Sequence, residues 1–167
     1  QGSQSVGMMD AFSEVSVVKD TFEEASAILQ QDMWQLAHAG SEEQLALTTN
    51  TQPLMLISDV AIYRAWIKLG GKLPSILAGH SLGEYAALVA SGALNFIDAV
   101  QLVRQRSELM QNAVPSGVGA MAAVLGLSDE NIILACQNAT AEGGVAEPAN
   151  YNAPGQVVIA GDKETVE

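Results

Sequence analysis

Ser81 has the surroundings that most clearly suggest chemistry. Residues 78–84 read Ala-Gly-His-Ser-Leu-Gly-Glu, so Gly79 and Gly83 flank the serine at two residues on either side. An apolar run precedes this Gly-x-Ser-x-Gly pattern and an alanine-rich segment follows it. This order predicts a buried strand, a sharp turn and a helix.

The predicted turn would make Ser81 a nucleophile. At a sharp reversal Gly79 and Gly83 approach closely, and we expect a Cβ on either one to clash. The serine hydroxyl then meets a helix N-terminus, where unpaired N–H groups favour a developing negative charge. We therefore expect Ser81 to attack a carbonyl, with the Leu82 N–H in the oxyanion hole. The alternative is a glycine-rich turn in which the serine only caps the helix.

A serine nucleophile needs a base, and the chain contains two histidines, His38 and His80. Consecutive side chains diverge at a sharp turn, so we expect His80 to be a structural residue near the site. His38 falls near the end of a short helix predicted around Trp34, where a histidine more often interacts with the helix dipole. We expect the base to lie outside these 167 residues.

Arg106 is the second residue that suggests chemistry. It falls in the apolar stripe of a helix predicted to end near Ala113, whereas Arg104 lies off that stripe. The stripe consists of Ala99, Val103, Arg106, Met110 and Ala113. An inward-facing arginine keeps its charge and must meet an anion. Periodicity leaves two alternatives open: an internal pair with an Asp or Glu, or a bidentate clamp on a substrate carboxylate.

The composition is that of a globular protein and excludes several classes. The chain has 167 residues, 49% of them hydrophobic and 16% charged, enough for one domain with a real core. A net charge of −12 argues against nucleic acid as a partner. The single cysteine, Cys136, cannot form an internal disulfide and favours a cytoplasmic location. The longest apolar stretch, Leu54–Leu69, is interrupted by charges, so we expect no membrane span; we also expect no metal site and no cofactor.

The elements predicted around Ser81 form a large α/β part over residues 1–116. Thr51-Gln52-Pro53 is a typical helix entry, with threonine as cap and proline in the first turn. A strand is predicted to begin at Pro74 and lead to the serine. That strand is apolar on both faces and needs parallel neighbours, yet no second strand is evident before residue 117. We therefore expect a further strand before Gln1.

Residues 117–167 differ from the preceding part of the chain in their predicted secondary structure. They predict a strand, a helix, two strands and the start of another helix at Asp162. This order is that of a partial ferredoxin-like subdomain, βαββαβ without its last strand. Because the last predicted helix stops after one turn, we expect several elements after Glu167.

Taken together, these motifs resemble the malonyl-type acyltransferase family, in particular the bacterial malonyl-CoA:acyl-carrier-protein transacylases. The resemblance covers essentially the whole chain, and the Gly-His-Ser-Leu-Gly-Glu elbow with an arginine twenty-five residues later is its most specific part. The segments that carry it are Gln1-Gly2-Ser3-Gln4, Thr51-Gln52-Pro53, Gly79–Tyr85, Arg106, Gly119-Ala120-Met121 and Asn152–Gln156. It implies an α/β hydrolase-like acyltransferase domain with an inserted ferredoxin-like small subdomain.

The resemblance also implies roles for particular residues. Ser81 would take malonyl from malonyl-CoA and pass it to the phosphopantetheine thiol of acyl carrier protein, for fatty acid biosynthesis. The N–H groups of Leu82 and Gln1 would hold the oxyanion, Arg106 would bind the malonyl carboxylate, and Gln52 would line the substrate site. The family's catalytic histidine lies after the small subdomain, so we expect these residues alone to be inactive.

Other readings remain. A serine hydrolase of the lipase or esterase type shares the elbow, although the inward-facing Arg106 favours a charged acyl group. Within the acyltransferases, the alternative is the acyltransferase domain of a polyketide synthase. A non-catalytic binding module has no need of a serine between glycines. The resemblance implies a monomer that meets an acidic carrier protein, and either Arg64, Lys68 and Lys72 or the rest of the protein would have to supply the basic patch.

Overall fold

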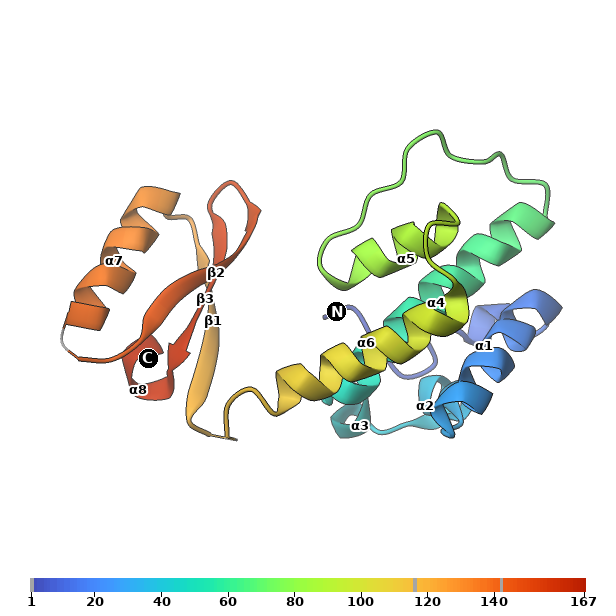
Figure 1. The fold of residues 1–167 in the computed structure, drawn as a ribbon, viewed down its shortest axis with the longest axis horizontal. Helices are drawn as coiled ribbons and strands as arrows, with labels where there is room; N and C mark the ends of the chain where they lie inside the picture. Colours follow the sequence, from blue (N-terminus) through green and yellow to red (C-terminus); the bar gives the residue numbers. More distant parts are fainter. Residues whose placement is uncertain (1, 116, 142) are drawn as a thin grey trace. The chain divides into compact units, whose positions relative to one another are not determined.

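The computed structural model describes residues 2–115, 117–141 and 143–167, and the chain divides into two compact units. The first unit is Gln1–Gln111 and the second is Asn112–Glu167. Each unit has its own buried cluster of apolar side chains. Figure 1 shows that regular strands occur in the second unit, whereas the first consists of helices and loops.

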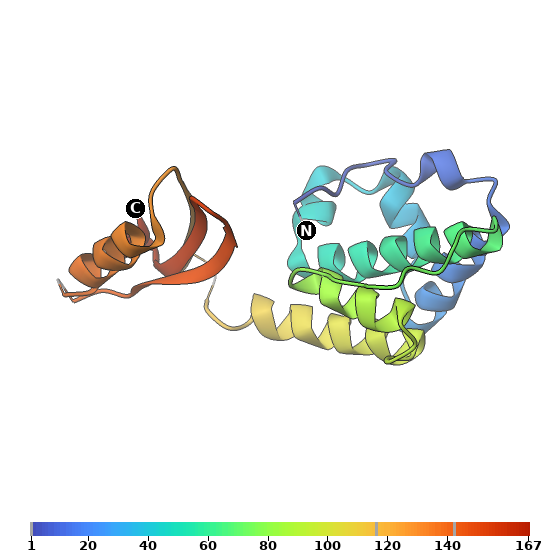
Figure 2. The same ribbon diagram turned by 90° about the horizontal axis from the view of Figure 1, so that it is seen from above.

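The first unit is built around the long helix α4, which packs against α1, α5 and α6. Figure 2 shows α4 and α6 running alongside each other. Phe22 and Leu54 are fully buried between these helices, and the Trp34 ring meets the Phe22 ring edge to face at 5.2 Å. The elements are the 3-10 turn η1 (Asp10–Phe12), α1 (Ser16–Leu29), α2 (Met33–Ala39), α3 (Glu42–Ala46), α4 (Thr48–Lys68), α5 (Leu82–Ala90) and α6 (Phe96–Gln111).

Helix α4 begins earlier than the sequence predicts. Its first residue is Thr48, so Pro53 lies inside the helix and Thr51 is not its cap. The buried Thr51 hydroxyl instead donates to the Leu47 carbonyl at 3.0 Å. The prediction failed because a proline at this depth usually ends a helix. Here the backbone carbonyl that Pro53 leaves without a partner receives a donor from α6.

Residues 71–80 lead to Ser81 without regular secondary structure, so the strand predicted from Pro74 is not formed. A strand needs a neighbouring strand to bond its N–H and C=O groups, and the described residues of the first unit contain none. Leu73 and Ile76 are 75% and 84% exposed, as expected for an apolar segment with nothing packed on it.

The second unit contains a three-stranded antiparallel sheet with the strand order β1-β3-β2. Strand β3 lies in the middle and pairs with β1 from Gly119↔Asp162 to Leu125↔Gln156. The elements are β1 (Gly119–Leu125), α7 (Asp129–Ala141), β2 (Ala146–Ala153), β3 (Gln156–Asp162) and α8 (Lys163–Val166). The sequence predicts a strand, a helix, two strands and the start of a further helix, and the structure confirms this order.

Helix α7 covers one face of this sheet. Ile132 and Cys136 of α7 are buried against Ala146 and Val157 of the strands. The cysteine is a free thiol. Along the parts of the chain that the structure describes, no helix has both the length and the apolar character to cross a membrane.

Candidate active site

Ser81 has a strained backbone at the start of α5. Its φ of 53° and ψ of −111° lie outside the regions that residues with a Cβ normally adopt. Among the described residues, Gln30 is the other non-glycine residue with positive φ, but it occupies the ordinary left-handed helical region. Such strain costs on the order of 1–3 kcal/mol and is typical of functional sites.

The Ser81 hydroxyl does not cap the helix. Although Ser81 occupies the N-cap position of α5, its side chain makes no capping hydrogen bond. The hydroxyl oxygen instead accepts a hydrogen bond of 3.0 Å from Nη2 of Arg106. The alternative of a serine that serves only as an N-cap is therefore wrong.

The two glycines around Ser81 have different reasons to be there. A Cβ on Gly79 would lie 2.0 Å from the carbonyl carbon of Gly83, which no side chain tolerates. A Cβ on Gly83 would meet nothing within 4 Å. The prediction that both glycines avoid a clash is thus confirmed for Gly79 and wrong for Gly83, because the Cβ direction of Gly83 points away from the turn.

Arg106 on α6 joins the serine to α4. Its Nη2 donates to Ser81, and its Nη1 donates to Oε1 of Gln52. The guanidinium carbon lies 5.8 Å from the centre of the Tyr85 ring, within the range of a cation–π contact. Ion pairs among the described residues involve His38, Arg64 and Lys163, and none involves Arg106. The internal Asp or Glu partner considered from the sequence is therefore not found there.

Gln52 is fully buried and both ends of its amide are occupied. Its Nε2 donates to Oγ1 of Thr48 at 2.8 Å and approaches Sδ of Met110 at 3.4 Å. Because the amide nitrogen faces Thr48 and Met110, the oxygen faces Arg106. The orientation of the arginine is thus set from inside the first unit.

Two contact residues escaped the sequence reasoning. Tyr85 follows Ser81 by four residues, and Thr48 precedes Gln52 by four on the same helix. Residues four apart lie on one helix face, so this spacing could have brought both to notice.

The other residues that the sequence singled out do not contact the Arg106–Ser81 pair through any hydrogen bond or ion pair seen among the described residues. Leu82 is buried and is the first residue of α5, so its N–H has no intrahelical acceptor. His80 is exposed, and its carbonyl accepts the Gly83 N–H at 2.9 Å, which helps to close the turn. His38 Nδ1 lies 2.7 Å from the carboxylate of Asp10. Gln1 lies outside the described residues.

The basic residues considered for a docking patch are partly occupied within the chain. Arg64 pairs with Glu24 at 2.7 Å and lies over the Phe96 ring, 4.4 Å from its centre. Lys68 donates to the hydroxyl of Ser16 at 2.9 Å. The charge of Arg64 is thus paired within the chain, whereas Lys68 keeps its charge because its acceptor is a neutral hydroxyl.

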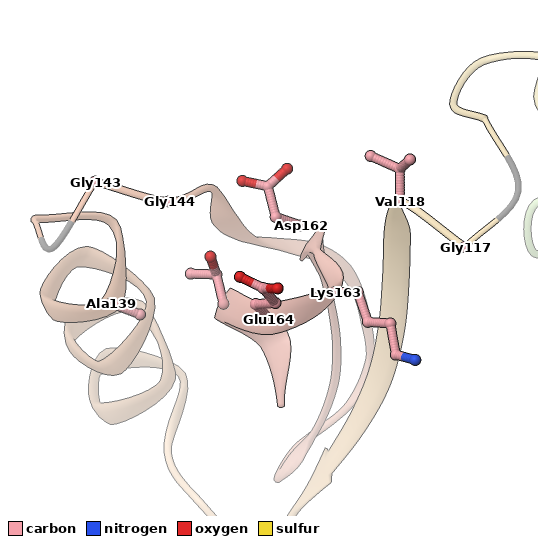
Figure 3. Close-up of a pocket in the computed structure, with 9 residues that line it drawn as sticks. Gly117, Val118, Ala139, Gly143, Gly144, Asp162, Lys163 and Glu164 are labelled. Atoms are coloured by element: carbon pink, nitrogen blue, oxygen red, sulfur yellow. The ribbon is translucent and has the colours of Figure 1, made fainter.

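The second unit has a separate hollow of about 670 Å³, shown in Figure 3. Asp162, one of its lining residues, accepts the Val145 N–H at 2.9 Å and so serves the sheet. None of the residues predicted to do chemistry lines it. In the described ranges, we find no group of three or more His, Cys, Asp or Glu side chains able to hold a metal ion.

Comparison with known proteins places this arrangement in a family. The family described as "Acyl transferase domain" matches residues 1–167, and the chain belongs to it. The malonyl CoA-acyl carrier protein transacylase of Escherichia coli K12 is 55% identical over 168 residues. That of Bacillus subtilis is 45% identical, also over the whole of this chain. The chain spans 54% and 53% of these two proteins, about half the length of the curated relatives that it matches.

Solved structures agree with this assignment. The acyl-carrier-protein S-malonyltransferase of Burkholderia pseudomallei has a TM-score of 0.94 at 57% identity, over 99% of this chain and 53% of that one. A malonyl-transacylase in complex with a type II PKS acyl-carrier protein has a TM-score of 0.93 at 51% identity, over 99% of this chain and 54% of that one. The α/β fold of the acyltransferases is therefore shown for this chain.

The contrast between the two glycines gives a matched pair of substitutions. Gly79→Ala should lower the free energy of unfolding by about 2 kcal/mol or more, because its Cβ meets backbone atoms that cannot move alone. Gly83→Ala should be neutral or stabilise by up to about 1 kcal/mol, since alanine favours the helix. Urea denaturation followed by circular dichroism measures both. Equal effects would contradict the one-sided contact.

The positive φ at Ser81 predicts that the protein becomes more stable when the Cβ of this residue is removed. Ser81→Gly should raise the free energy of unfolding by about 1 kcal/mol, because glycine adopts positive φ freely. Ser81→Ala keeps the Cβ and serves as the control, with little change expected. Denaturation midpoints of the two variants make the comparison, and a glycine variant less stable than the alanine variant would show that the turn is unstrained.

Proposed function

We propose that the full-length protein transfers a malonyl group from malonyl-CoA to the phosphopantetheine thiol of acyl carrier protein. The observation that carries the proposal is the 3.0 Å contact between the Arg106 guanidinium and the Ser81 hydroxyl. It sets a fixed positive charge beside a serine held in a strained turn. An acyl group that ends in a carboxylate suits this pair, since its carbonyl can reach the serine while its carboxylate meets the arginine.

The proposed reaction has two steps. Ser81 Oγ forms a bond to the thioester carbonyl carbon, the C–S bond breaks, and coenzyme A leaves as the thiol with the serine's proton. The carrier-protein sulfur then forms a bond to the malonyl carbonyl carbon, the ester C–O bond to Ser81 Oγ breaks, and the thiol's proton returns to the serine oxygen. We assign the base to a histidine outside these residues, since Nδ1 of His38 contacts Asp10, and the consecutive side chains of His80 and Ser81 are expected to diverge at a sharp turn.

The oxyanion of each step would be stabilised by backbone donors. The Leu82 N–H at the start of α5 supplies one, supported by the positive end of the helix dipole. We assign the second to the N–H of Gln1. Gln52 would hold Arg106 in place and line the acyl site.

The fold supports the same proposal in two finer respects. The apolar segment 71–80, which has no strand partner here, and the strained Ser81 would form the strand and turn of a nucleophile elbow in an α/β hydrolase-like domain. The order β1-β3-β2, with α7 on one face, matches the first three strands of a ferredoxin-like subdomain in residues 117–167.

The hydrolase alternative is weaker. A lipase or esterase would place apolar side chains beside its nucleophile, whereas here the hydroxyl's partner is a guanidinium. We assign the carrier protein to fatty acid synthesis. Polyketide synthesis is the alternative, because a similar malonyl-transacylase has been solved in complex with a type II PKS acyl-carrier protein.

Covalent loading of Ser81 tests the proposal. Intact mass spectrometry of the full-length protein with malonyl-CoA should show a malonyl adduct that is absent in Ser81→Ala and is discharged by holo acyl carrier protein. Acetyl-CoA serves as the parallel sample. A folded full-length protein that forms no adduct, or loses it to water as fast as to carrier protein, would contradict the transferase.

Arg106 should decide which acyl group is accepted. Arg106→Ala should lower kcat/KM for malonyl-CoA by about 2–5 kcal/mol of transition-state binding and leave acetyl transfer unchanged or higher. The exposed Lys19→Ala is a charge-matched control and should change neither. Equal losses for malonyl and acetyl would show that Arg106 has a structural role alone.

A further inference from the structure

Pro53 leaves one backbone carbonyl of α4 without its usual donor. A residue in a helix donates its N–H to the carbonyl four residues earlier, and proline has no N–H. The carbonyl concerned is that of Thr49, in the first turn of α4. Nη1 of Arg104 donates to this carbonyl at 2.7 Å, from the neighbouring helix α6.

The other end of the same guanidinium is also engaged. Nη2 of Arg104 donates to Oε1 of Gln31 at 2.6 Å, just after the left-handed residue Gln30 that ends α1. Nε2 of Gln31 donates to Oδ1 of Asn50 at 3.1 Å. One half-buried arginine thereby ties α6, the end of α1 and the first turn of α4 together.

That first turn also holds the site. Thr48 precedes Thr49, and its hydroxyl accepts the Gln52 amide N–H at 2.8 Å. The amide oxygen of Gln52 accepts from Arg106. Arg104 is therefore linked to Arg106 step by step. Arg104 binds the Thr49 carbonyl, the backbone connects Thr49 to Thr48, and hydrogen bonds lead from Thr48 through Gln52 to Arg106.

We propose that Arg104 is a positioning residue for the acyl site. By replacing the donor that Pro53 lacks, it fixes the first turn of α4, from which Thr48 orients Gln52 and Gln52 orients Arg106. The inference rests on the proposed function and adds to it a determinant of acyl-group preference that does not touch the substrate.

A ligand site at Arg104 is the competing interpretation. Arg104 lines an open hollow of about 780 Å³ between the end of α1 and α6, together with several glutamines. Both terminal nitrogens of Arg104, however, already donate to Thr49 and Gln31 at short distances. A ligand would have to displace these bonds, so positioning accounts better for the geometry.

The test compares acyl preference in variants of the full-length protein. Arg104→Met keeps the apolar stem and loses the donors, and we expect its ratio of kcat/KM for malonyl-CoA to that for acetyl-CoA to fall about tenfold. Adding Pro53→Ala restores an N–H for the Thr49 carbonyl and should recover most of that ratio. Gln105→Ala, an exposed neighbour on α6, is the matched control and should leave it unchanged.

Thr48→Val tests the same series of contacts at its other end. It should lower the malonyl-to-acetyl ratio, because Gln52 loses the acceptor for its amide nitrogen. An unchanged ratio in Arg104→Met or in Thr48→Val, or equal losses with both acyl groups, would overturn the proposal even if the other variant failed to fold. A wild-type protein without malonyl transfer would instead refute the proposed function itself.

Discussion

The candidate site of the first unit depends on the guanidinium of Arg106. Among the described residues, no carboxylate forms an ion pair with this guanidinium. It donates instead to the amide oxygen of Gln52 and to the hydroxyl of Ser81. Those acceptors are neutral, so the charge is solvated but not cancelled, and a half-buried uncancelled cation attracts an anion strongly. Helices α4, α5 and α6 each contribute to this one point, and their packing is what keeps the charge beside the serine.

The sequence predicted those parts of the site whose geometry follows from residues close together in the chain. The pattern around Ser81 specified the exposed hydroxyl at a helix start, and helical periodicity placed Arg106 on the inner face of α6. Periodicity could not choose between an internal acid and a substrate, because that choice depends on which side chains α4 brings alongside. Arg104 shows the same limit, since it lies two residues from Arg106 and yet also reaches α4.

The fold was predictable where local signals agree and not where they compete. Residues 117–167 have alternating strands and clear turns, and their elements form in the predicted order. The start of α4 was misplaced because Pro53 is a strong helix-ending signal, and a distant arginine compensates for it. The strand before Ser81 was predicted from its apolar residues, but pairing depends on a partner that no local pattern supplies.

The unpaired segment 71–80 has a consequence for handling this chain. The ends of this segment are hydrogen-bonded at Gly71, Lys72 and His80, but its middle, which contains the exposed Leu73 and Ile76, has no strand partner and can serve as a template for intermolecular β-pairing. Pro74 interrupts the row of donors and limits such pairing to a few residues, as gatekeeper prolines do. The net charge of −12 opposes association through repulsion, which salt screens. Self-association through this segment should therefore grow with ionic strength, because salt screens the repulsion between chains.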